Sequence, residues 1–125
     1  MDGKPSDARV NYRLLPDFET AGVGVVVRTT LLPSLHDIKQ INGRIITGSF
    51  EAEGSPMTFI CAYAPHSGHN TEVKEDFYEQ LSTEISQTKG RYFIGGDFNA
   101  RLHYVREHEK DCCGQYIIGR GNDYT

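Results

Sequence analysis

Several features that define common protein classes are missing from this sequence of 125 residues. No stretch approaches ~18 consecutive apolar residues, which excludes a membrane-spanning helix. The first residues, MDGKPSDARVNYR, contain no apolar signal core and no cleavage pattern. The chain has only three cysteines, Cys61, Cys112 and Cys113, and an odd number does not form a secreted disulfide framework. We therefore expect a reducing, intracellular setting.

Basic charge is not in excess either. Thirteen Lys and Arg residues are outnumbered by seventeen Asp and Glu residues, which gives a formal net charge of -4. This balance argues against a protein that binds nucleic acid through its bulk charge, although it leaves room for a locally basic groove. The hydrophobic share of 38% and the charged share of 24% are typical of a folded globular chain. At this length we expect one domain, or part of one, with a single hydrophobic core.

Short apolar segments separated by turn signals dominate the first half of the chain. The run GVGVVVR is rich in β-branched residues and has no helical period, so we expect a buried strand there. Asn42-Gly43 is a strong hairpin signal, because both residue types tolerate positive φ. Together the segments predict an antiparallel meander. The expected strands span residues 22–28, 38–40, 44–52 and 57–64.

One amphipathic helix is expected at residues 72–89. Thr71 is its expected N-cap, and Lys89-Gly90 is its expected end. Apolar side chains recur every four residues along this segment and form one stripe, which we assign to core packing. The stripe consists of Val73, Phe77, Leu81 and Ile85.

These elements predict an α+β or layered α/β sandwich fold of mostly antiparallel strands. A short apolar strand at 92–94 follows the helix and returns the chain to the sheet. Two segments lack apolar periodicity, so we expect an irregular lead-in at 1–20 and an irregular tail at 101–125. The residues between them, 22–100, are expected to form the core.

The sharpest local feature is the segment GGDFNA at 95–100. In an extended segment Asp97 and Asn99 project from the same face, while Phe98 points the other way, into the core. The carboxylate can hold a hard cation or orient a water, and the amide can donate to a phosphate oxygen. Such a pair suits hydrolysis of a phosphate ester. Without further context, the favoured alternative is that both residues only shape a turn.

The context is provided by Tyr63, which stands in the segment CAYAP at the end of an expected strand. Its phenol can donate to a phosphate, although by itself a tyrosine of the core or rim is the commoner case. The segments GVGVVV, GRII, YAP, FYEQL and GGDFNA follow one another in this order. With them the chain resembles the endonuclease–exonuclease–phosphatase superfamily. It is most similar to the apurinic-type endonuclease domain of non-LTR retrotransposons and to craniofacial-development-protein-like sequences, from about Gly22 to Ala100 and weakly on to Asn122.

The resemblance implies a role for each matched residue. Tyr63 falls where the family has a tyrosine that hydrogen-bonds the scissile phosphate. Asp97 falls where an aspartate orients or deprotonates the attacking water near the metal, and Asn99 where an asparagine binds the phosphate. Asp97 and Asn99 are thus the candidate metal-site residues, with Mg²⁺ or Mn²⁺ as the implied cofactor. Arg44 matches an arginine after the hairpin, whose role we take as structural.

Two further residues beside these motifs are candidate contacts to phosphate or DNA. Arg101 directly follows GGDFNA, and His66 follows YAP. The alternatives without a function are a mixed solvated surface for the arginine and an exposed loop for the histidine, which stands three residues from His69.

The implied activity is metal-dependent hydrolysis of phosphodiesters, most directly by a DNA endonuclease of retrotransposon type. A phosphatase that acts on a small phosphate ester or a phosphoinositide is the first alternative, and an inactive relic or binding module is the second. The resemblance also implies DNA as a partner, no membrane, and an intracellular location, the nucleus included.

The family's fold is a four-layer α/β/β/α sandwich of roughly twice this length. Residues 1–125 are therefore expected to form a single partial domain. It lacks a matching motif for the upstream asparagine and glutamate of the family and for its closing Asp-His pair. We expect little or no activity from the isolated chain, because losing members of a cooperating site costs orders of magnitude in rate. One sheet face is expected to lack its cover, which favours self-association.

A last cluster contains the atom types that bind zinc. His103, His108, Cys112 and Cys113 follow one another at short spacing. Adjacent cysteines suit one tetrahedral site poorly, so we favour a polar loop with an incidental pair of thiols.

Overall fold

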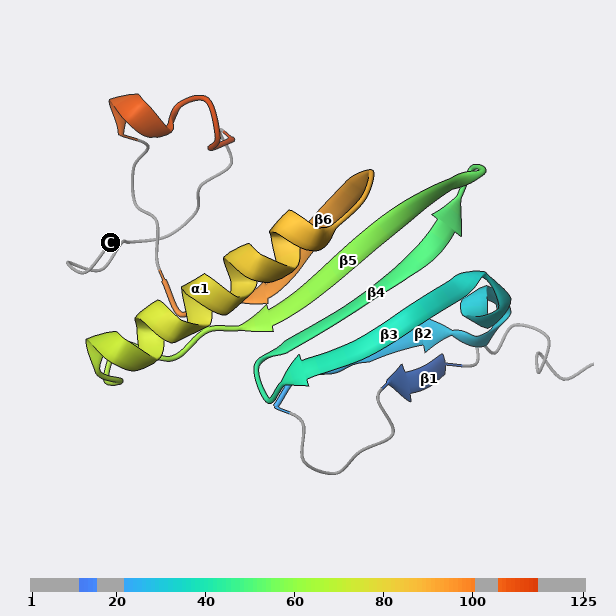
Figure 1. Cartoon of the computed structure of the whole chain (residues 1–125), viewed down its shortest axis with the longest axis horizontal. Coiled ribbons are helices and arrows are strands. Elements are labelled where there is room, and N and C mark those ends of the chain that lie inside the picture. The colour runs from blue at the N-terminus through green and yellow to red at the C-terminus, as the bar shows by residue number, and fades with distance from the viewer. Residues whose placement is uncertain (1–11, 16–21, 101–105, 115–125) are drawn as a thin grey trace, which may run out of the picture.

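The computed structural model describes residues 12–15, 22–100 and 106–114 (Figure 1). The described part contains a two-stranded sheet, a four-stranded sheet and one α-helix, and so confirms the α+β class with mostly antiparallel strands. None of its helices is long and apolar enough to cross a membrane. The strands are β1 (Tyr12–Leu15), β2 (Val25–Arg28), β3 (Leu35–Asn42), β4 (Ile45–Ala52), β5 (Ser55–Tyr63) and β6 (Arg91–Asp97). The helices are α1 (Thr71–Gln87) and the 3₁₀ turns η2 (Thr29–Ser34) and η3 (Glu107–Glu109).

The larger sheet has the strand order β3-β4-β5-β6. Its first three strands form the expected antiparallel meander, joined by hairpin turns at Gly43-Arg44 and Glu53-Gly54, the first of them one residue later than the expected Asn42-Gly43. β6 instead runs parallel to β5, because α1 carries the chain back along the sheet between them. The C-terminal ends of β5 and β6 therefore lie side by side at one edge of the sheet.

Helix α1 covers one face of this sheet near β5 and β6 (Figure 1). The buried core between them combines both elements and consists of Ile45, Ile60, Ala62, Ala64, Phe77 and Leu81. Ile85 and Phe98 pack against this core. The apolar stripe of the helix thus serves core packing as expected, and Phe98 points into the core as expected.

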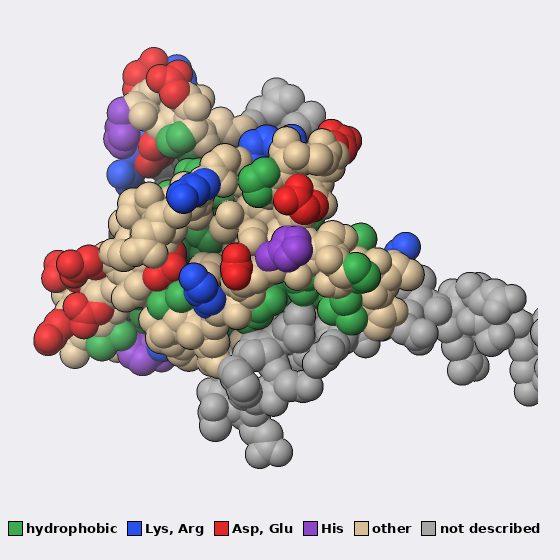
Figure 2. All heavy atoms as spheres, turned by 45° about the vertical axis from the view of Figure 1, so that its right-hand side comes forward, with side chains coloured by type: hydrophobic (Ala, Val, Ile, Leu, Met, Phe, Trp, Pro, Cys, Tyr) green, Lys and Arg blue, Asp and Glu red, His purple; other side chains and the backbone are tan. Residues whose placement is uncertain are grey.

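The opposite face of the sheet is only partly covered. Side chains alternate along a strand, so this face carries the aromatic rings of Phe50, Phe59 and Phe93, whose centroids lie 6.2 to 6.4 Å apart. Phe93 is 48% exposed, although strand β2 lines a groove over the same face. Figure 2 shows apolar side chains reaching the surface at several places, among acidic and basic side chains that are interspersed.

The N-terminal strands differ from the expectation in two ways. Tyr12–Leu15 is a strand, although the first twenty residues were expected to be irregular, and it pairs antiparallel with Val25–Arg28. β2 therefore belongs to a separate sheet rather than to the meander, and Val26 in it is 62% exposed. A β-branched run indicates a strand, but it does not say which strand it pairs with or how deeply it is buried.

The other strands have wider bounds than the apolar runs suggest. Leu35–Asn42 and Arg91–Asp97 both extend beyond the expected 38–40 and 92–94. Apart from Leu35 and Ile41, the extra residues are polar or glycine, and they join the strands through backbone hydrogen bonds that a hydrophobic pattern does not report.

The N-cap of α1 is Asn70 rather than Thr71. The Asn70 Oδ1 accepts a hydrogen bond from the backbone N–H of Val73 at 2.9 Å. At the other end the helix stops at Gln87, two residues before the expected end, because the N–H and hydroxyl of Thr88 both bond to the carbonyl of Ile85.

We expect Asn70→Ala to destabilise the protein by about 1 kcal/mol, because the substitution leaves a backbone donor of the first turn without its side-chain acceptor. Thr71→Ala is the matched control, since the Thr71 side chain does not cap the helix, and should change stability by less than about 0.5 kcal/mol. Urea unfolding of both variants measures the difference. Equal losses in the two variants would contradict this assignment of the cap.

Candidate active site

The parallel pairing of β5 and β6 places Tyr63 directly opposite Asp97. The backbone N–H of Ala64 donates to the carbonyl of Asp97 at 2.8 Å, so the pairing continues one residue past Tyr63. Paired residues of neighbouring strands project from the same face, so the phenol and the carboxylate lie on the face of the sheet opposite α1. Both side chains are exposed, Tyr63 to 39%.

Gly96 makes this close pairing possible. It has a φ of 152°, and a Cβ at this position would lie 1.8 Å from the carbonyl oxygen of Ala62. The neighbouring Gly95 has nothing within 4 Å of the equivalent position. Only the second glycine of the motif is therefore required by the approach of the two strands.

Asn99 reaches the same edge by a turn rather than by an extended strand. β6 ends at Asp97, and Asn99 has a φ of 49°, so the expectation that both side chains project from one extended segment is wrong. The backbone N–H of Asn99 donates to the Asp97 Oδ1 at 2.8 Å, which closes a tight turn. The Asn99 Nδ2 donates to the carbonyl of Ala64 at 2.7 Å and ties the turn to the end of β5. The structure thus brings Tyr63, Asp97 and Asn99 to one edge of the sheet.

The turn leaves both polar side chains with capacity for a ligand. In the part of the chain that the structure describes, the recorded hydrogen bond to the Asp97 carboxylate goes to Oδ1, and Oδ2 has no recorded partner. The amide of Asn99 has two N–H bonds, of which Ala64 takes one. A turn-shaping role and a role in binding are therefore compatible for these two residues.

The described residues fit only part of a Mg²⁺ or Mn²⁺ site. Within residues 12–15, 22–100 and 106–114, no group of three or more His, Cys, Asp and Glu side chains could hold a metal ion. Mg²⁺ prefers six oxygen ligands, several of which are often waters and substrate oxygens. Asp97 can provide one of them, with the amide oxygen of Asn99 beside it. We therefore do not expect the isolated chain to bind the cation tightly.

Arg44 contacts Tyr63 and His69 contacts Arg44, and the sequence did not reveal the importance of either residue. The backbone carbonyl of Arg44 accepts a hydrogen bond from the backbone N–H of Tyr63 at 2.8 Å. The Arg44 Nη1 donates a hydrogen bond to the carbonyl of Tyr63 at 3.2 Å. The guanidinium lies 5.2 Å from the centroid of the Tyr63 ring, within the range of a cation–π interaction. Its Nη2 lies 3.5 Å from the Nε2 of His69. The hairpin at Glu53-Gly54 sets the register of β4 and β5 and could have predicted the pairing of Arg44 with Tyr63, but not the contact with His69.

His66 lies in the same loop and stacks on His69, with ring centroids 4.1 Å apart. It is exposed, and its Nδ1 accepts the backbone N–H of Gly68 at 3.0 Å. Partial burial, and then the positive charges of His66, Arg44 and Lys74, hold the pKa of His69 below its usual value. His66 is thus a neighbour of the Tyr63 region through His69 and Arg44, whereas Arg101 lies outside the described residues.

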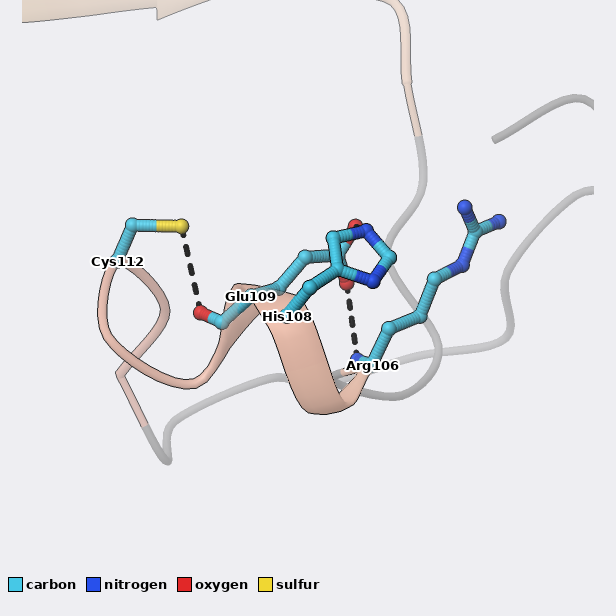
Figure 3. Close-up of polar contacts among 4 residues, drawn as sticks. All are labelled: Arg106, His108, Glu109 and Cys112. Atoms are coloured by element: carbon cyan, nitrogen blue, oxygen red, sulfur yellow. Dashed lines mark hydrogen bonds and ion pairs between the residues drawn. The ribbon is translucent and has the colours of Figure 1, made fainter.

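The candidate zinc residues that the structure describes belong to the turn around η3 (Figure 3). There the Glu109 carboxylate accepts a hydrogen bond from the backbone N–H of Arg106. The backbone carbonyl of Glu109 accepts a hydrogen bond from the thiol of Cys112. Burial and the adjacent Cys112 raise the pKa of the Cys113 thiol, which disfavours the thiolate that zinc requires. These described residues therefore favour the incidental pair of thiols, and His103 lies outside them.

Comparison with known proteins gives few matches. No known family profile and no curated protein sequence matches the chain. A similar solved structure is the inositol polyphosphate 5-phosphatase domain of SPsynaptojanin, in complex with inositol (1,4)-bisphosphate and calcium ion. The two have 18% sequence identity and a TM-score of 0.45 over 83% of this chain. The matched part spans 36% of that domain's chain.

Proposed function

We propose that this chain is part of a metal-dependent hydrolase of phosphodiesters, most directly a DNA endonuclease of retrotransposon type within the endonuclease–exonuclease–phosphatase superfamily. The observation that carries the proposal is the meeting of Tyr63, Asp97 and Asn99 at the ends of β5 and β6. They combine a phenol, a carboxylate and an amide on one edge of a sheet. Hydrolysis of a phosphate ester needs an oriented water and donors for the charge that develops on oxygen.

Each side chain has a distinct task in this proposal. The Oδ2 of Asp97 orients the attacking water and accepts its proton. The phenol of Tyr63 and the remaining N–H of Asn99 donate to the oxygens of the phosphate as negative charge builds on them. A bound Mg²⁺ or Mn²⁺ would supply a positive charge that neutralises the phosphate.

We further propose that the partner is DNA and that the protein acts inside the cell, the nucleus included. The residues that would complete the metal site are not among those described, so we expect slow turnover by the chain as it stands. The partly covered face with Phe50, Phe59 and Phe93 is a proposed surface for self-association.

A phosphatase for a small phosphate ester or phosphoinositide is a second candidate. The net charge of -4, with interspersed acidic and basic side chains on the surface of Figure 2, favours a small ligand over a polyanion. The incomplete set of metal ligands favours an inactive relic or binding module as the third candidate.

Plasmid nicking tests the proposed function, because one cut relaxes a whole supercoiled molecule and so reveals slow turnover. We expect a chain extended at both ends to relax supercoiled plasmid in the presence of Mg²⁺ or Mn²⁺, and a chelator to stop it, since the metal neutralises the phosphate. Release of phosphate from a small phosphomonoester is measured beside it. Hydrolysis of the small ester alone would contradict the endonuclease function and support the phosphatase function. Hydrolysis of neither, even by a chain extended at both ends, would contradict both.

A further inference from the structure

We propose that four basic side chains in and around the loop after Tyr63 form a second phosphate-binding site, separate from the position where hydrolysis takes place. These side chains, named here the basic cluster, are Arg44, His66, His69 and Lys74. The inference extends the proposed function, since this site would hold a second phosphate group of the same substrate. Binding of phosphate to the cluster can nevertheless be measured whether or not the chain hydrolyses anything.

Arg44 connects the cluster to the candidate active site. One nitrogen of its guanidinium is bonded to the carbonyl of Tyr63, and another contacts the imidazole of His69. The Arg44 side chain is half-buried, and these two contacts hold its guanidinium in place. Arginine has five N–H donors, and the contacts described here use two of them at most. The remaining donors are available to an anion beside Tyr63.

The loop between β5 and α1 holds the other three members close together. His69 donates its backbone N–H to the carbonyl of His66 at 3.0 Å, and the two rings stack. The Lys74 Nζ donates to the carbonyl of Ser67 at 3.0 Å, which brings a lysine of the helix onto the loop. A Cβ on Gly68 would lie 2.8 Å from the ring of His66, so the tight loop favours glycine over a larger residue at this position. The loop is thus preorganised by its own hydrogen bonds.

Among the described residues no carboxylate forms an ion pair with the cluster, although Glu72, Glu75 and Asp76 share the first turns of α1 with Lys74. Among the residues that the structure describes, ion pairs are recorded only at His108–Glu109 and Lys110–Glu107, far from the cluster in sequence. Partial burial lowers the pKa of His69, and the charged groups that lower it further are His66, Arg44 and Lys74, all of them basic. Basic groups held together without an ion-paired carboxylate favour binding of an anion, which relieves their repulsion.

Phosphate is the ligand chemistry that the cluster fits. A guanidinium, an ammonium and imidazoles are the usual donors to phosphate oxygens, and charge-assisted hydrogen bonds from them are short and strong. Because the cluster adjoins Tyr63, the second phosphate would belong to a substrate with at least two phosphate groups. Neighbouring nucleotides of DNA meet this requirement, and so does a small bisphosphorylated molecule.

Titration with inorganic phosphate, followed by NMR of the histidine ring protons, tests the site in the intact chain. We expect saturable shifts of His66 and His69, with a dissociation constant on the order of millimolar. Bound phosphate should raise the pKa of His69, because an opposite charge favours the protonated ring. Affinity should therefore increase as the pH falls through the pKa of the free His69.

Charge-neutral variants separate specific binding from screening. Lys74→Gln and His66→Gln should each weaken phosphate binding about fivefold or more, since each removes a donor from the cluster. Lys89→Gln, just beyond the other end of α1, removes the same charge and should leave the affinity unchanged. An equal effect of Lys74→Gln and Lys89→Gln, or the absence of saturable shifts, would overturn the proposal.

Two competing ligands identify the source of the phosphate. A short DNA duplex that shifts the same histidines at lower concentration than inorganic phosphate supports the site and assigns it to nucleic acid. A small bisphosphorylated polyol that does so supports the site and assigns it to a small ester. If the duplex and the polyol both bind more weakly than inorganic phosphate, the cluster does not bind a second phosphate group of a substrate. Phosphate binding without any hydrolysis would preserve this inference while removing the proposed function.

Discussion

Gly96→Ala is expected to destabilise the protein by about 3 kcal/mol or more, and to lower its Tm by about 10 °C or more. Two costs add up at this position. The φ of 152° is unfavourable for a residue with a side chain, and the new Cβ would lie 1.8 Å from the carbonyl oxygen of Ala62. That oxygen belongs to the backbone of β5, so no side-chain rotation relieves the clash. β5 and β6 must separate at the position where Tyr63 and Asp97 are paired.

Gly95→Ala is the matched control, one residue earlier in the same strand. A Cβ there meets nothing within 4 Å, so the stability should change by less than about 1 kcal/mol. Thermal unfolding of the two variants by circular dichroism gives the comparison. If both alanines cost the same, the close approach of β5 and β6 is not the reason for glycine at position 96.

Asp97→Asn is expected to lower the rate of phosphodiester hydrolysis by a factor of about 10² to 10⁴, the range of a general base. This substitution keeps an oxygen that can accept the N–H of Asn99, so the turn is preserved. It removes the negative charge that, in the proposed function, orients the water and attracts the metal. Stability should therefore change little while activity falls.

Asp97→Ala removes the turn as well as the charge. We expect the same loss of activity and an additional loss of stability of about 1 kcal/mol, the usual contribution of one hydrogen bond. Asp76→Asn, an exposed carboxylate of α1, is the control for the change in net charge. Plasmid nicking that survives Asp97→Asn would reduce Asp97 to the turn-shaping role that its short motif also allows.

Local patterns in the sequence predicted the larger sheet and the helix well. The Asn42-Gly43 turn and the apolar runs around it indicate the meander, because hairpin formation depends on neighbouring residues. The period of Val73, Phe77 and Leu81 likewise indicates the face of α1 that is buried. The sequence did not predict the pairing of β2 with β1, since the chemistry of a strand does not specify a distant partner.

The candidate site likewise combines residue types that the sequence indicates with contacts that only the fold creates. Tyr63, Asp97 and Asn99 are recognisable as residue types suited to phosphate, because Tyr63 and Asp97 end apolar strands and Asn99 lies in the turn that follows. The turn at Asp97 and Asn99 depends on a left-handed backbone conformation that an Asp-x-Asn spacing does not specify. Arg44 and His69 are separated by twenty-five residues, and only the folded loop brings them together beside Tyr63.

Within residues 22–100 the sequence by itself determined which segments become strands and helix, and which side chains have the chemistry to bind phosphate, because these properties depend on residues close to one another in the chain. The tertiary structure alone decided that β6 runs parallel to β5, and that four basic side chains gather in and around the loop after Tyr63. Such contacts join residues far apart in sequence. Their geometry follows from how the helix packs on the sheet, and no local pattern contains that information.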